Sequence, residues 1–207
     1  MKKKLLSLIM AVVMIFTVSL ALAKTVEPED PEIERFAGRT VHATVGEYVD
    51  YLNAFRVTVY ENDRFDDDDI ERLAAGDILL ADGTTYTVKE ITTSPDGELM
   101  AVMENGTEIV FERAGDDYTA RFTDDDRHCM HAIAVVLLKP AEGMVYEDNS
   151  DPDLDAQMIV VDNLEEILKI KAEKEKTSIG FDFYGTTVTL NGKLEIVKIH
   201  QDFDVAQ

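Results

Sequence analysis

The chain of 207 residues has 42 acidic and 20 basic side chains, which give a formal net charge of −22. Such a charge repels nucleic-acid phosphates and anionic lipid head groups, so the composition excludes both as partners. It is compatible with binding of cations, with a basic partner, or with solubility outside a cell.

The first 23 residues have the pattern of a Sec-type signal peptide. Three lysines at positions 2–4 precede an apolar run over 5–18, and the small residues Ala21 and Ala23 flank Leu22. This pattern predicts cleavage after Ala23 and a secreted or cell-envelope protein that is not inserted in the membrane after cleavage. An uncleaved membrane anchor is the alternative, because a span needs only about 20 residues.

Residues 24–38 are charged, contain Pro28 and Pro31, and lack an apolar period, so they predict a linker. From Arg39 the residues alternate in polarity and are rich in β-branched and aromatic types, which is typical of half-buried strands. The clearest signal is the hairpin dipeptide Asp82-Gly83, between the apolar runs 78–81 and 84–88. Similar turns recur, so residues 39–140 are predicted to form a mainly β domain, an antiparallel meander closed as a small barrel or sandwich.

One short helix is expected near residues 68–75, inside this β-rich domain. Asp68 and Glu71 have the spacing of a capping box, and the other aspartates of the run suit the first turn of a helix. Consecutive acids at a helix start point in different directions, so we favour capping over metal binding here.

The remainder is predicted to be an acidic connection over 141–157 and a small α+β lobe over 158–207, which alternatively completes the first domain. The lobe is expected to have a helix over 162–176, capped by Asp162 or Asn163, with a strand as the competing interpretation. A terminal hairpin over 186–200 follows, turning at Asn191-Gly192.

No catalytic residue is predicted from the reactive side chains. Cys129 is the only cysteine, so an exported chain has no internal disulfide. Along a strand, His128 and Met130 would face one way and Cys129 and His131 the other, which leaves too few ligands for a tetrahedral metal site and no base beside the thiol.

The most specific motif is the acidic segment 151–162. Asp151, Asp153 and Asp155 occupy its first, third and fifth positions, Met158 the eighth, and Asp162 the twelfth. This spacing resembles an EF-hand or dockerin-type calcium loop, in which carboxylates surround one Ca²⁺ and a helix follows. The resemblance implies these four aspartates as calcium ligands.

The segment departs from that pattern at the second, sixth and ninth positions, where it has Pro152, Ala156 and Ile159. Two functional hypotheses follow from the sequence. One is a non-enzymatic exported module that binds or spaces a protein or cell-surface polymer and uses no cofactor. The alternative is a calcium-dependent adhesion or scaffold protein that uses the loop at 151–162.

Overall fold

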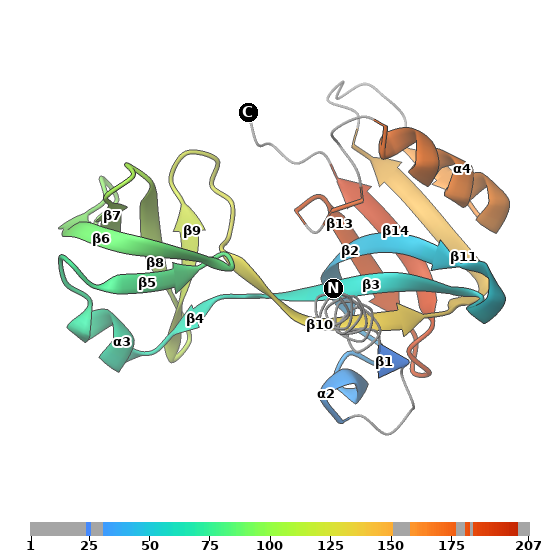
Figure 1. Ribbon diagram of the computed structural model, residues 1–207, viewed down its shortest axis with the longest axis horizontal. Helices are drawn as coiled ribbons and strands as arrows, with labels where there is room; N and C mark the ends of the chain where they lie inside the picture. Colours follow the sequence, from blue (N-terminus) through green and yellow to red (C-terminus); the bar gives the residue numbers. More distant parts are fainter. Residues whose placement is uncertain (1–23, 26–30, 151–157, 177–180, 183, 203–207) are drawn as a thin grey trace, which may run out of the picture. The chain divides into compact units, whose positions relative to one another are not determined.

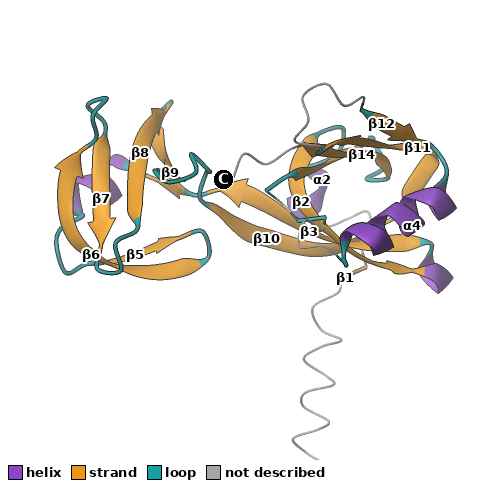
Figure 2. Cartoon of the chain, turned by 90° about the horizontal axis from the view of Figure 1, so that it is seen from above, coloured by secondary structure: helices purple, strands orange, loops and turns teal. Residues whose placement is uncertain are grey.

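The computed structural model describes residues 24–25, 31–150, 158–176, 181–182 and 184–202. It confirms a mainly β protein, with 56 % strand, in which one of the two sheets is curled into a half-barrel. The elements are coloured along the chain in Figure 1 and by type in Figure 2. No helix in these described ranges is both long enough and apolar enough to cross a membrane.

The first sheet has eight strands in the order β1-β10-β3-β2-β13-β14-β11-β12. In that order they are β1 (Lys24–Thr25), β10 (Met130–Leu138), β3 (Ala54–Asn62), β2 (Thr40–Val49), β13 (Thr186–Leu190), β14 (Ile196–Asp202), β11 (Pro140–Asn149) and β12 (Ile159–Val161). The second sheet has six strands in the order β4-β9-β8-β7-β6-β5. They are β4 (Arg64–Phe65), β9 (Asp117–Phe122), β8 (Glu108–Ala114), β7 (Leu99–Met103), β6 (Thr84–Thr93) and β5 (Ile78–Ala81). The helices are α2 (Pro31–Glu34), η1 (Asp50–Leu52), α3 (Asp67–Arg72) and α4 (Leu164–Lys174).

The chain forms two compact units. Among the described residues, unit 1 comprises 24–25, 31–59, 134–149, 158–176, 181–182 and 184–201, and unit 2 comprises 60–133, 150 and 202. The boundaries therefore fall inside β3 and β10, and β13 of the predicted C-terminal lobe pairs with β2 in one sheet.

The core of unit 1 is mainly apolar and also contains a buried hydrogen-bonded chain of Tyr146, Gln201 and Thr186. Phe55, Ile196 and Ile199 are fully buried, and the Tyr146 ring stacks on Phe181 with centroids 5.4 Å apart. The helix α4 lies beside β11 in Figures 1 and 2 and contributes the buried Ile167. Burial of such side chains is the main stabilising contribution to this unit.

Unit 2 is built around the predicted hairpin. Asp82 and Gly83 have φ values of 52° and 64°, and Ala81 pairs with Thr84, as a two-residue turn between twisted strands requires. The inner residues of the sheet form a second core, which includes Phe111, and the Phe65 ring meets it edge-on at 5.3 Å between centroids.

Both helix predictions are confirmed in position, and one differs in its cap. Helix α3 lies over 67–72, but its capping box joins Asp66 and Asp69, two residues earlier than expected. The run of four aspartates offers two capping registers, and the structure adopts the earlier one. Helix α4 is a helix as predicted, and Asn163 is its cap, because its side chain accepts the N–H of Glu166 at 3.1 Å.

Described parts of two segments that were expected to lack regular structure form a helix and a strand. In the connection predicted over 141–157, residues 140–149 form β11, whose Met144, Tyr146 and Asp148 are buried on one face. The linker predicted over 24–38 contains α2 and buries Ile33 and Phe36. In both cases a few apolar side chains at the correct spacing outweigh a polar composition.

Candidate functional site

A buried polar cluster of unit 2 is centred on the carboxylate of Asp63, whose side chain is 10 % exposed. Its Oδ2 accepts the backbone N–H of Asp82 at 2.6 Å, and its Oδ1 lies 2.7 Å from Nδ1 of His131. Residues from the end of β3, the β5–β6 turn and the start of β10 therefore meet at one carboxylate. Buried carboxylates need such donors to offset the loss of water.

Asp82 extends this cluster. Its Oδ1 accepts the N–H of Met130 at 3.2 Å, and its Oδ2 lies 4.0 Å from a guanidinium nitrogen of Arg127. The Arg127 guanidinium also lies over the Phe122 ring, 4.9 Å from its centroid, which is within the limit of about 6 Å for a cation–π contact. Donors directed at both carboxylates fix the turn in place.

Cys129 lies against the same cluster and is fully buried. Burial, followed by the charges of Asp82 and Asp63, raises the pKa of its thiol to about 12. The thiolate is the reactive form of cysteine, so this residue is not a nucleophile at neutral pH.

We therefore expect the native protein to resist thiol reagents. At pH 8, Ellman's reagent should modify Cys129 at least a hundredfold more slowly in buffer than in 8 M urea, where the thiol is exposed and its pKa returns to about 8.5. The absorbance of released thionitrobenzoate measures both rates. Equal rates in the two solutions would show that the thiol is accessible.

The four histidines are divided between the two units. His42 and His200 belong to unit 1, and His128 and His131 belong to unit 2. Within the residues described, no three His, Cys, Asp or Glu side chains form a group that could hold a metal ion. The expected alternation around Cys129 is wrong, because Cys129 and Met130 are both buried: β10 begins only at Met130, and His128 is joined to Arg121 by an isolated bridge.

Of the four predicted calcium ligands, only Asp162 lies in the described part of the chain. Asp151, Asp153 and Asp155 fall outside it, so the calcium prediction stays a prediction. Asp162 is exposed and lies between β12 and α4.

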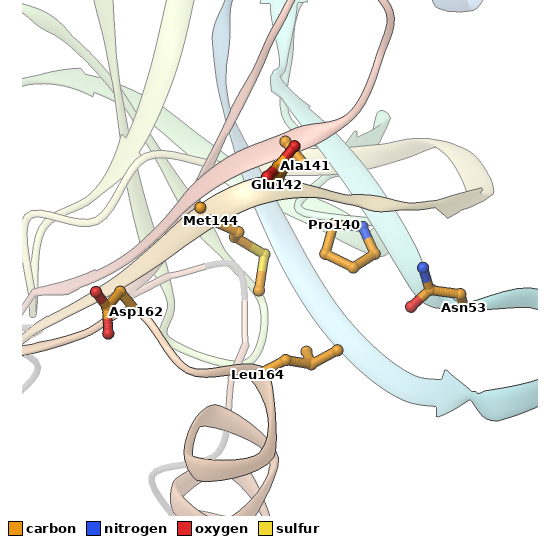
Figure 3. Close-up of a pocket in the computed structure, with 8 residues that line it drawn as sticks. Asn53, Pro140, Ala141, Glu142, Met144, Asp162 and Leu164 are labelled. Carbon is orange, nitrogen blue, oxygen red and sulfur yellow. The ribbon is translucent and has the colours of Figure 1, made fainter.

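Asp162 lines a hollow of about 360 Å³ in unit 1, which the sequence analysis did not anticipate. The other lining residues are Asn53, Pro140, Ala141, Glu142, Gly143, Met144 and Leu164. In Figure 3, Asp162 and Asn53 lie on opposite sides, with the side chains of Met144, Pro140 and Leu164 between them. The hollow thus has an apolar floor and polar groups at its rim.

Large exposed apolar side chains mark the end strands of both sheets. Ile78 and Leu80 of β5 are each 64 % exposed, and Ile159 and Val160 of β12 are 54 % and 56 % exposed. These strands are the last in their sheets. Strands at a sheet edge usually carry charges or proline, which prevent pairing with other chains, so apolar side chains there are unusual.

The backbone of β5 is also oriented for pairing. In the antiparallel ladder of β5 and β6, every second residue of β5 is hydrogen-bonded to β6. Asp77 is one of these residues, because its C=O accepts the N–H of Val88 at 2.9 Å. By this alternation the N–H and C=O groups of Ile78 and Leu80 point away from β6. The N–H of Asp82, next in the same row, is taken by Asp63.

Comparison with known proteins adds no functional information. No protein family, no curated protein and no solved structure matches this chain.

Proposed function

We propose that this is an exported, non-enzymatic module that binds an extended segment of a partner protein at the cell surface. The observation that supports it is the end strand β5, where the exposed side chains of Ile78 and Leu80 belong to the same residues whose backbone groups point away from β6. An extended peptide that adds a strand to such an edge gains main-chain hydrogen bonds, and its side chains contact Ile78 and Leu80.

The charge of the chain favours a basic partner over a second copy. Two copies with a net charge of −22 each repel one another, whereas a lysine- or arginine-rich segment is attracted and oriented before it docks. The partner chemistry is therefore an extended, basic and partly aliphatic segment.

A display experiment tests this proposal. Random twelve-residue peptides are selected against residues 24–207, and the dissociation constants of the recovered peptides are measured by fluorescence anisotropy. We expect basic peptides whose affinity falls at least tenfold for Leu80→Lys, because the new charge repels them and removes an apolar contact. Leu80 is already solvent-exposed, so the variant retains the fold.

Tyr51→Lys is the matched control, because Tyr51 is 87 % exposed and belongs to neither end strand. Its affinity should stay within twofold of the parent. Failure to recover a basic binder, or equal losses for the two lysine variants, would contradict binding at this edge.

A calcium-dependent adhesion or scaffold protein is the second candidate. It is supported by Asp162, whose exposed carboxylate directly precedes the cap of α4, as a helix follows the loop in calcium sites of this spacing. In this case millimolar Ca²⁺ raises the melting temperature and Asp153→Ala removes the rise. Identical melts in calcium and in chelator would exclude it.

A further inference from the structure

The hollow in unit 1 combines an apolar floor with carboxylates that the rest of the unit does not neutralise. Met144 is 4 % exposed and fills the floor with Pro140 and Leu164. Glu142 and Asp162 are exposed acids on its lining. Neither forms an ion pair or hydrogen bond with another residue in the described part of the chain.

The local structure explains why the carboxylate of Asp162 does not cap α4. Asn163 provides the cap of α4, so the carboxylate one residue earlier is not needed there. Two of the three lysines of α4 are engaged elsewhere, because Lys171 pairs with Glu175, and Lys174 lies 2.7 Å from Asp148. An acidic rim therefore faces solvent beside an apolar surface.

These groups suit an organic cation better than a metal ion. Calcium takes six to eight oxygen ligands, and the floor of Met144, Pro140 and Leu164 supplies none from its side chains. The side-chain oxygen of Asn53 already accepts the hydroxyl of Tyr48 at 2.5 Å. A side chain with a long aliphatic stem and a positively charged end matches both the apolar floor and the acidic rim of the hollow. Such side chains bury the stem and keep the charged end in water.

We propose that this hollow binds an arginine or lysine side chain of the partner protein, with arginine preferred. The stem lies over Met144 and Leu164, and the charged end is placed between the solvent and the carboxylates of Glu142 and Asp162. A guanidinium is favoured because its planar array of donors can bind two carboxylate oxygens at once. The inference rests on the proposed function for its partner, but it concerns a different surface from β5.

The test uses a small probe in place of the partner. Residues 24–207 are labelled with ¹³C at the methionine methyl groups and titrated with N-acetyl-arginine methylamide, while NMR follows the Met144 methyl signal. We expect a saturable shift of that signal at millimolar concentrations, and a smaller affinity for the lysine analogue. N-acetyl-citrulline methylamide, which has nearly the same shape and no charge, should bind at least tenfold more weakly.

Two variants locate the binding. Glu142→Gln combined with Asp162→Asn should weaken the arginine probe roughly tenfold, because each exposed ion pair contributes about 0.2 to 1 kcal/mol. Both positions are exposed, so the fold is retained. Asp116→Asn, an exposed acid in a turn of unit 2, is the control and should leave the affinity unchanged.

An unshifted Met144 signal, a shift of equal size with the citrulline probe, or a double variant that binds like the parent would each overturn the proposal. The methyl signal of Met100, in β7 of unit 2, should not move and reports non-specific effects. The probe does not need the β5 edge. A negative result here together with edge-dependent peptide binding would therefore refute this site alone, and the reverse result would refute the edge alone.

Discussion

Replacement of Asp63 by alanine is expected to lower the free energy of unfolding of unit 2 by about 3 kcal/mol. The loss is large because the carboxylate is buried and serves two elements at once. Alanine leaves the N–H of Asp82 without the acceptor that now lies 2.6 Å away, and His131 loses a partner at 2.7 Å. A donor left unsatisfied in a half-buried position costs more than the bond it once made.

Urea titration of the variant and the parent measures this difference, with reaction of Cys129 as the reporter of unit 2, because that thiol is fully buried in the native fold. Asp63→Asn keeps an oxygen that can accept the N–H of Asp82, so it should lose about half as much. Asp116→Ala, in an exposed turn, should change stability by less than about 0.5 kcal/mol. If Asp63→Ala matches that control, the cluster does not stabilise unit 2.

Tyr146→Phe is expected to destabilise unit 1 by about 2 kcal/mol, although it removes only one hydroxyl group. That hydroxyl donates to the side-chain oxygen of Gln201 at 2.6 Å, and the amide nitrogen of Gln201 lies 3.4 Å from the Thr186 hydroxyl. All three side chains are buried, so water cannot replace the lost donor. Thermal melts followed by circular dichroism measure the change, with Tyr51→Phe as the exposed control.

The same tyrosine predicts a dependence on pH. Burial, followed by the charge of Asp148, raises the pKa of Tyr146 above the ordinary value near 10. In the unfolded chain the phenol ionises near pH 10 while the native phenol stays protonated, so its contribution is complete below pH 10 and is lost as pH rises further. The stability of the parent should therefore fall more steeply above pH 10 than that of Tyr146→Phe, and parallel curves would contradict the raised pKa.

Local signals in the sequence predicted the parts of the fold that local physics determines. The Asp82-Gly83 turn needs only two residues that accept positive φ, and α4 needs only a cap and an apolar face, so both were found. The strand β11 was missed because Asp148 occupies a buried position of its alternating pattern. That position is acceptable because Asp148 has partners within the fold, among them Lys174, which is distant in sequence and lies 2.7 Å away.

The candidate sites likewise combine residues that local sequence signals identify with residues that only the folded chain brings together. Asp162 was identified from its spacing, but its neighbours in the hollow, Asn53 and Glu142, come from elements far away in the chain. The Asp63 cluster joins residues that are 19 and 68 positions apart. Such groupings depend on which strands become neighbours, and a single sequence carries no direct signal of that choice.

The placement of the unit boundaries within two strands has a consequence for how this protein can be rearranged. The chain leaves unit 1 after Val59 and returns to it at Ala134, on strands β3 and β10, which are neighbours in the sheet and run in opposite directions in Figure 1. Residues 60–133 are thus inserted into unit 1 between two neighbouring strands. We expect that a short loop or a different domain can replace this insertion without interrupting the strand order of the sheet in unit 1.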